Sequence, residues 1–558
     1  MRPHKNDLNP EKPERRRFLR SGVTLSAAAL AMPAYAAGTS APAPGGQAEA
    51  DGVKPFELDE ITLAELQQGL ASGKYTERSL AEKYLGRIAE IDTSGPAINS
   101  VIELNPEALA IADALDEERK AKGARGPLHG VPVLIKDNIG TADRMTTTAG
   151  SLALLGFTPR KDSGVAARLR EAGALILGKT NLSEWANIRS SHSSSGWSGR
   201  GGQTRNPYAL DRSPCGSSSG SGAGASASLC AVAVGSETDG SIVCPSSANG
   251  IVGIKPTVGL VSRAGIIPVA HSQDTAGPMG RCVADAAALL GALAGADAED
   301  SATKAPGRKA EADYTKFLDR AGLKGARIGV VRRLNDFDES IASALGAAYD
   351  AMRHEGAVLI DPVEIASLGK FEQSELDVLL YELKHDLNAY LAAAGPQAPV
   401  RSLKEVIRFN EQYEDREMAY FGQDLFEKAE KKGPLTDKAY VDALAKNHLL
   451  ARTQGIDAVM TKHRLDALVA PTTGPTWLID LVDGDHDTGG SSSLAAVAGY
   501  PNISVPMGFV RGLPVGISFF GRAWSEPALI RIAYAFEQAT KRRKPPRFLP
   551  AADFSVNT

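Results

Sequence analysis

The sequence predicts an α/β domain built around a largely buried sheet. Short, wholly apolar runs alternate along the chain with amphipathic helical patterns, and this alternation is typical of α/β proteins. Of the 558 residues, 43% are hydrophobic and 23% are charged, which excludes a disordered or fibrous chain. Glycine accounts for 56 of the 558 residues, which exceeds the average share of about 7% and indicates that some segment of the chain is unusually rich in glycine.

The elements follow in order from residue 62. Apolar residues spaced three and four apart predict helices at 63–70, 80–88, 105–122 and 165–172, with Asn105 and Pro106 as the cap and first turn of the third. Apolar runs at 131–135 and 174–177 predict buried strands, and residues 229–234 predict a short apolar helix.

Residues 190–228 are rich in serine and glycine, and composition alone would make them a flexible linker. They lead directly into ordered-looking motifs, however, which favours a backbone-rich site instead. Residues 300–450 carry charged amphipathic patterns, of which 404–432 predicts the longest helix. We expect a helical layer there that supplies pocket residues. Glycine, serine and short apolar strands return at 489–521.

The N-terminus predicts export. A basic stretch (ERRRFLR, 14–20), a short apolar stretch (22–32) and the sequence PAYA (33–36) form a signal of the twin-arginine type at residues 1–36. The alternative is a disordered basic tail. We therefore expect a periplasmic or secreted protein, with a linker at 37–57. No apolar run is long enough for a membrane span, and the net charge of −4 does not indicate the excess of basic residues that nucleic-acid binding needs.

The four cysteines are Cys215, Cys230, Cys244 and Cys282. Their spacing matches no zinc pair, and although an exported protein could oxidise them, we expect small buried thiols.

Two short motifs in the serine-rich segment point to other chemistry. GSSSG at 216–220 fits the nucleophile elbow of α/β-hydrolases, with Ser218 as nucleophile, and GSGAGA at 220–225 fits a dinucleotide fingerprint. Both motifs require a strand just before them, and DRSPC at 211–215 makes a poor strand. We therefore disfavour both.

A longer series of blocks is more specific. The blocks are GVPVLIKDN (130–138), TAGS (148–151), GKTN (178–181), GSSSGSG (216–222), GSETDGSIVCP (235–245), GIKPT (253–257) and AGYP (498–501). In this order and spacing the chain resembles the amidase signature family over roughly residues 58–540, least strongly across 300–450. The resemblance implies one large domain (58–545) with a mixed central sheet covered by helices on both faces, followed by a tail at 546–558. It implies no metal and no cofactor.

The resemblance also implies a Ser–cis-Ser–Lys triad with Ser241 as nucleophile, Ser217 as bridge and Lys136 as base. The bridging serine would follow a cis bond at Gly216–Ser217, where glycine minimises the clash. Serine is a weak nucleophile without an adjacent base, and lysine is a base only when burial lowers its pKa. Lys136 follows four apolar residues, which agrees with burial.

The implied reaction is amide hydrolysis through an acyl-enzyme, with Ser218 in a supporting position. The backbone N–H groups that would stabilise the oxyanion are those of Thr238, Asp239, Gly240 and Ser241.

Two departures from the common family pattern bear on the substrate: Asp239 replaces a frequent glycine, and Val243 a frequent arginine. The blocks ETDGS (237–241) and HSQDTAGPM (271–279) resemble the exported peptide amidases, which predicts a peptide C-terminal amide as substrate, with ammonia released. Small, aryl or fatty amides are the alternatives within the family. In a different class, a periplasmic oligopeptide-binding protein fits the length and the signal. His271 is expected to be a polar loop residue and not a triad histidine.

Overall fold

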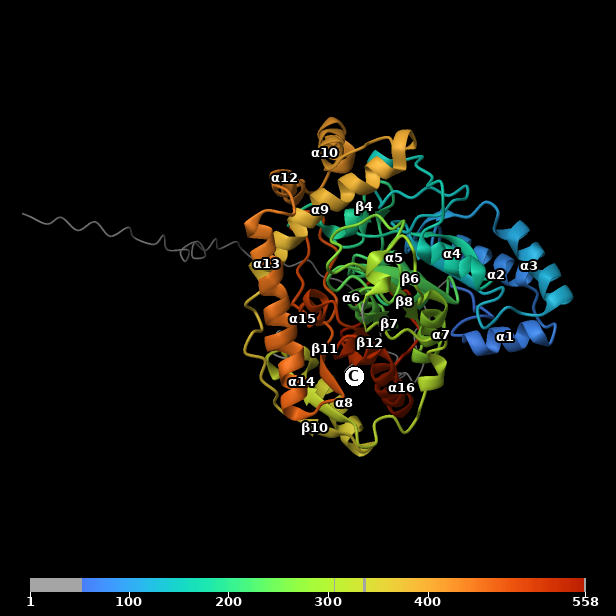
Figure 1. Cartoon of the computed structure of the whole chain (residues 1–558). Helices are drawn as coiled ribbons and strands as arrows, with labels where there is room; N and C mark the ends of the chain where they lie inside the picture. Colours follow the sequence, from blue (N-terminus) through green and yellow to red (C-terminus); the bar gives the residue numbers. More distant parts are fainter. Residues whose placement is uncertain (1–52, 306, 335–337, 556–558) are drawn as a thin grey trace, which may run out of the picture. The chain divides into compact units, whose positions relative to one another are not determined.

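The computed structural model describes residues 53–305, 307–334 and 338–555. The predicted signal at 1–36 and most of the predicted linker lie outside these residues. The centre of the domain is a mixed 11-stranded sheet surrounded by helices (Figure 1). This confirms the predicted α/β class and the single large domain.

The strands lie side by side in an order that differs from their order in the chain. From edge to edge they are β1 (Val101–Leu104), β3 (Leu175–Thr180), β2 (Pro132–Lys136), β6 (Val232–Glu237), β8 (Thr275–Gly280), β7 (Val252–Lys255), β12 (Asn502–Val510), β13 (Leu513–Phe520), β11 (Ala467–Pro471), β9 (Arg327–Val330) and β10 (Val358–Ile360). The trios β3–β2–β6 and β11–β9–β10 are parallel, and every other neighbouring pair is antiparallel. A separate two-stranded sheet pairs β4 (Trp197–Ser198) with β5 (Gly202–Gln203).

The helices are mostly short. The α-helices within the described ranges are α1 (Leu63–Ala71), α2 (Glu77–Ile91), α3 (Ala108–Lys122), α4 (Gly164–Glu171), α5 (Ser219–Ser226), α6 (Val243–Ala248), α7 (Val283–Leu293), α8 (Ala342–His354), α9 (Glu372–Ala394), α10 (Leu403–Gln412), α11 (Glu414–Glu417), α12 (Asp424–Glu430), α13 (Lys438–His448), α14 (Asp457–His463), α15 (Ser493–Ala498) and α16 (Glu526–Thr540). A π-helical stretch, Leu449–Ile456, joins α13 to α14.

Helices cover both faces of the sheet, and the alternation of side chains along β13 shows which lies where. A Cβ added at Gly516 would lie 2.9 Å from Ser247 Oγ, so this face of the strand meets α6. Phe519 points to the opposite face, where its ring centroid lies 5.5 Å from that of Phe536 in α16. The sheet is therefore the middle layer of the domain.

The predicted elements in the first 180 residues are confirmed as α1 to α4, β2 and β3. The cap predicted at Asn105 is wrong, because α3 begins at Ala108 with Glu107 as its N-cap. Two later predictions are wrong. Residues 229–234 lead into strand β6, because this segment pairs with β2 and β8 in the centre of the sheet. The stretch 404–432 is divided among α10, α11 and α12, and α9 is the longest helix. The break falls where Glu417 and Asp424 turn toward the core and bond to Leu152 N and Ser190 Oγ.

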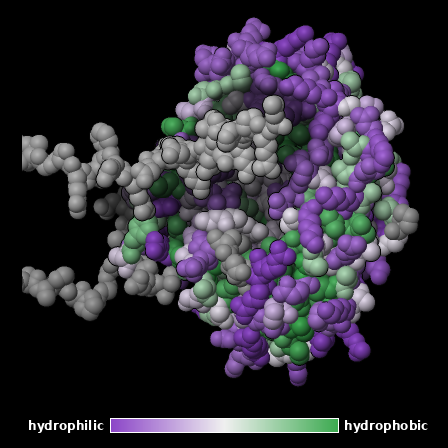
Figure 2. Space-filling view, turned by 90° about the vertical axis from the view of Figure 1, so that its left-hand side faces the viewer, coloured by the Kyte–Doolittle hydropathy of each residue, from purple (hydrophilic) through white to green (hydrophobic). Residues whose placement is uncertain are grey.

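Residues on both sides of the predicted domain bounds contact the body. The ring of Phe56 lies 5.8 Å from that of Tyr84, and Phe548 is buried near the C-terminus. The helices α9, α10, α12 and α13 lie together (Figure 1), and the side that carries α13 is mainly hydrophilic with smaller hydrophobic areas (Figure 2). No helix within the described ranges is long and apolar enough to cross a membrane.

Candidate active site

The predicted base, Lys136, is the last residue of β2 and is fully buried. Because β2 and β6 are parallel neighbours, their C-terminal ends meet at one edge of the sheet. There Lys136 Nζ donates hydrogen bonds to Ser217 Oγ (2.8 Å), Ser236 Oγ (3.0 Å) and Ser236 O (3.1 Å). Burial lowers the pKa of Lys136 to about 7, although the charges of Asp274 and Glu237 act in the opposite direction. A large fraction of the amine is therefore neutral near pH 7.

The predicted bridge, Ser217, precedes α5 and follows a cis peptide bond at Gly216–Ser217, as the family resemblance implies. Its side chain is buried, and its carbonyl accepts a hydrogen bond from Ser183 N (3.0 Å). A Cβ at Gly216 would lie 2.1 Å from Ser183 Oγ, so only glycine fits there without a rearrangement. Gly216 thus allows Ser217 to approach Lys136.

The predicted nucleophile, Ser241, lies in the turn between β6 and α6 and is 7% exposed. Gly240 before it has a φ of +78°, which favours glycine. The carbonyl of Ser241 accepts a hydrogen bond from Ser218 N (3.1 Å), which brings the two serine segments together. The carboxylate of Glu237 accepts from the N–H groups of residues 242–243 (2.7 and 3.0 Å) and closes the turn.

The four predicted oxyanion donors are successive residues of this turn: Thr238, Asp239, Gly240 and Ser241. Within the described residues, none of their N–H groups donates to a protein acceptor. Backbone N–H groups in folded proteins are rarely left in this state. The turn therefore presents donors that an anion could use.

The two rival motifs do not form the sites that they suggest. The hydroxyl of Ser218 is buried and donates to Ser236 O (3.0 Å) while accepting from Ser236 N (3.2 Å). No strand precedes this serine at 211–216. The motif at 220–225 lies inside the buried helix α5, where a Cβ at Gly220 would come within 2.1 Å of Ser100 O. Both motifs serve the packing of α5 against its surroundings.

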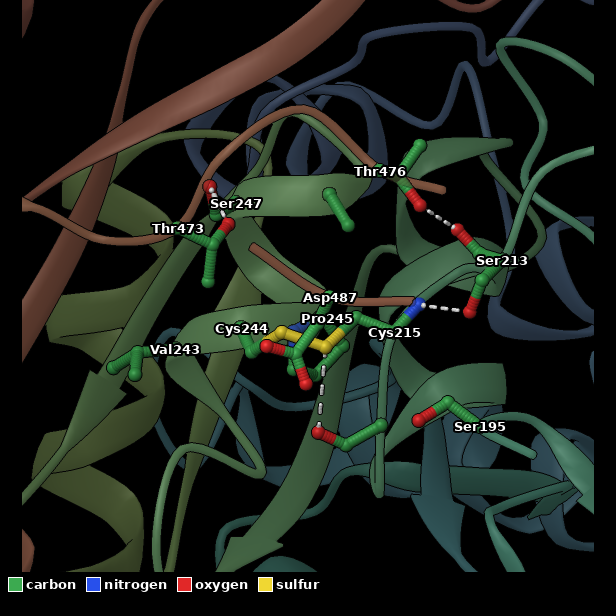
Figure 3. The surroundings of a disulfide bond; sticks show 12 residues. Ser195, Ser213, Cys215, Val243, Cys244, Pro245, Ser247, Thr473, Thr476 and Asp487 are labelled. Carbon is green, nitrogen blue, oxygen red and sulfur yellow. Dashed lines mark hydrogen bonds between the residues drawn. A yellow bond between two sulfur atoms is a disulfide. The ribbon is translucent and has the colours of Figure 1, made fainter. Parts of the chain in front are cut away.

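The expectation of small buried thiols is confirmed only for Cys230, since Cys282 is partly exposed and the other two cysteines are paired. Cys215 and Cys244 form a disulfide with Cα atoms 6.0 Å apart (Figure 3), while Cys230 and Cys282 are free. The disulfide joins the segment two residues before Ser217 to the first turn of α6. No spacing in the sequence marked this pair, because which cysteines meet depends on how the residues between them fold.

A cavity of about 250 Å³ opens beside Ser236, a hydrogen-bond partner of Lys136, although Lys136, Ser217 and Ser241 are not among the residues that line it. Its wall includes Asn138 and Ser236, and Asn138 Nδ2 donates to Ser236 Oγ (2.9 Å). Apolar side chains such as Ile267 and Val269 and the α9 residue Tyr390 also line it. The helical layer thus supplies part of a pocket, as expected, while the loop 263–275 and the ends of β2 and β6 supply most of the remaining wall. Sequence reasoning missed Ser236, although it lies within the quoted GSETDGS block.

His271 is on the rim of this cavity. Its side chain is 43% exposed, and Nδ1 pairs with Asp386 Oδ2 at 2.8 Å. The partners of His271 are thus carboxylates of α9, and the prediction of a polar loop residue agrees with this position.

A second buried polar cluster attaches the helical layer to the core. Arg189 is fully buried, its Nε lies 3.0 Å from Glu184 Oε1, and its Nη1 donates to Glu417 O (2.6 Å). Its guanidinium carbon lies 4.2 Å from the ring centroid of Phe421. Burial, together with the neighbouring Glu417, raises the pKa of Glu184 well above its usual value. No sequence motif indicated this cluster.

The family comparison agrees with this site. Residues 79–530 match the amidase family profile, so the chain belongs to the amidase signature family and is an amide hydrolase. The native peptide amidase of Stenotrophomonas maltophilia is 51% identical, with a TM-score of 0.84 and a match covering 88% of this chain and 100% of that one. A peptide amidase in complex with the competitive inhibitor chymostatin is 52% identical, with a TM-score of 0.86 and the same coverage. A probable amidase of Arabidopsis thaliana is 44% identical over 503 residues, which cover 88% of this chain and 93% of that protein.

Proposed function

We propose that the chain hydrolyses the C-terminal amide of peptides, with Ser241 as nucleophile, Ser217 as bridge and Lys136 as base. The observation that carries the proposal is the buried amine of Lys136, whose Nζ lies 2.8 Å from Ser217 Oγ. Similarity to the two peptide amidases supports the substrate class. Membership of a hydrolase family sets aside the alternative of an oligopeptide-binding protein.

In the first step, neutral Lys136 takes the proton of the Ser217 hydroxyl while Ser217 takes that of Ser241. The oxygen of Ser241 attacks the amide carbon, and the N–H groups of residues 238–241 stabilise the oxyanion. One such donor is worth about 3–4 kcal/mol in the transition state.

The tetrahedral intermediate then collapses and its C–N bond breaks. The proton held by Lys136 returns through Ser217 to the leaving nitrogen, which departs as ammonia when the amide is primary. Water attacks the remaining ester on Ser241 and gives its proton to the same relay. The free acid leaves and the serine hydroxyl is restored.

The test is ammonia release from a peptide amide. Ser241→Ala should abolish release, whereas Ser218→Ala should retain part of it, because that hydroxyl bonds only to the backbone of Ser236. Total loss in Ser218→Ala together with full activity in Ser241→Ala would overturn the assignment. A panel of peptide, fatty and aryl amides separates the proposed substrate from the family alternatives, and faster turnover of an aryl or fatty amide would reject the peptide assignment.

We also propose that residues 1–36 direct twin-arginine export to the periplasm or the medium. The arginine pair before Phe18 and Leu19 supports this, and so does the Cys215–Cys244 disulfide, since disulfides persist in oxidising compartments. Replacing both Arg15 and Arg16 with lysine should leave the protein in the cytoplasm. Unchanged export of that variant would contradict the proposal.

A further inference from the structure

The turn that carries the predicted oxyanion donors is held from outside by a second set of polar groups. Gln273 is buried, and its Nε2 donates to both Thr238 O (3.3 Å) and Glu375 Oε1 (3.0 Å). The hydroxyl of Thr238 donates to Asp274 Oδ1 (2.6 Å). Glu375 of α9, which follows the turn by more than 130 residues in the sequence, is thus linked to the turn through Gln273.

Glu375 also contacts the turn directly. Glu375 is 8% exposed, and its carboxyl group interacts with that of Asp239. Asp239 Oδ1 is buried, and no donor among the described residues bonds to it. Two carboxyl groups in such contact can bond to each other only when one of them carries a proton.

The surrounding charges decide which group holds the proton. Burial raises the pKa of Glu375 well above its usual value, and the neighbouring acids Asp239 and Glu372 act in the same direction. The other charged side chains that interact with Asp239 are Lys255 of β7 and Glu237 of β6. On α13, the neighbouring helix, Asn447 bonds to Ser374 O and brings no charge. The proton therefore belongs on Glu375.

We propose that protonated Glu375 is a positioning residue for the oxyanion turn: it donates a hydrogen bond to Asp239, accepts one from Gln273, and so fixes the N–H groups of residues 238–241. This inference rests on the proposed function, and it assigns a role in that reaction to the helical layer. Loss of the proton places two adjacent carboxylates against the turn. Their repulsion displaces the turn, and the added negative charge opposes the oxyanion.

The experiment compares Glu375→Ala and Glu375→Gln with the wild type, and uses Glu372→Gln as the matched control. Glu372 is an exposed acid one turn away on the same helix. We expect Glu375→Ala to lower kcat by about tenfold or more while KM changes by less than about twofold, because the oxyanion exists only after attack. Glu375→Gln should restore kcat at neutral pH, since an amide can also donate to Asp239.

The pH profile separates positioning from a merely structural role. The wild type should lose kcat on the alkaline side as Glu375 ionises. Glu372→Gln should keep this decline but show it at lower pH, because it removes an acid that raises the pKa of Glu375. Glu375→Gln should not show the decline. Identical alkaline profiles for the wild type and Glu375→Gln, or an unchanged kcat in Glu375→Ala, would overturn the proposal. If Glu375→Ala does not fold, Asp239→Asn provides the same test from the other side of the pair and should also remove the alkaline decline.

The two proposals fail in different ways. If Ser241→Ala remains active, the proposed function is wrong. If Ser241→Ala is inactive and the glutamate variants behave like the wild type, the proposed function stands and only the role of Glu375 is lost.

Discussion

Removal of the Cys215–Cys244 disulfide should lower the free energy of unfolding by about 3.6 kcal/mol. The link spans a sequence separation of 29 residues. For a loop of that size, the chain-entropy relation gives about 12 cal/mol/K, which is about 3.6 kcal/mol at ~25 °C. The closed loop contains α5 and the central strand β6, so the loss should appear in the main unfolding transition and not as a frayed end.

The assay is urea unfolding followed by tryptophan fluorescence, with wild type compared to the double variant Cys215→Ser, Cys244→Ser. The control is Cys282→Ser, which removes a free sulfur at the N-cap of α7, where serine is a favoured residue. Thiol titration of the denatured, unreduced wild type should find only Cys230 and Cys282. A destabilisation below about 1 kcal/mol, or four thiols before reduction, would refute the reasoning.

Two further predictions concern buried charge. The rate of amide hydrolysis should rise as pH increases through about 7, since below its pKa of about 7 Lys136 is protonated and cannot act as a base. Lys136→Arg should be inactive over the whole pH range. A wild-type kcat/KM that stays constant across this range would contradict the role of Lys136. Arg189→Leu should lower the free energy of unfolding by about 3–5 kcal/mol, because it leaves the Glu184 carboxyl group buried without its cation and the backbone carbonyl of Glu417 without its donor. Glu184→Gln in the same chain should recover part of that loss, and a leucine variant as stable as wild type would show that the cluster adds nothing.

Local patterns predict the N-terminal half of the fold well. Helical spacing locates α1 to α4, and apolar runs locate β2 and β3, because each of these elements buries one continuous stripe or run. The same reasoning fails at 229–234, where an apolar run is too short to separate a helix from a strand. It fails again at 404–432, where the contacts of Glu417 with the core override the helical pattern.

The base, the bridge and the nucleophile could be predicted from the sequence, because each lies in a contiguous block whose neighbouring blocks also resemble the family. The structure brings Lys136, Ser217 and Ser241 together at the C-terminal ends of the neighbouring strands β2 and β6. Glu375 could not be found in this way. Its role depends on a contact between a turn and a helix far apart in the sequence, and nothing near it on α9 marks it as different from any other acid in an amphipathic helix.

The sheet topology has a consequence for how substrate range can change. The chain leaves the sheet after β10, builds α9 to α14, and returns at β11, on the opposite side of β9 from β10. The proposed base, bridge, nucleophile and oxyanion donors all lie outside this excursion, whereas some of the residues that line the cavity lie within it. The excursion can therefore diverge, or be exchanged between relatives, as a module that leaves the chemistry in place. Positions that bond to the rest of the domain are not free to vary: a graft would have to present an acid or an amide where Glu375 meets the turn, and it would have to keep the contacts that Glu417 makes with the core.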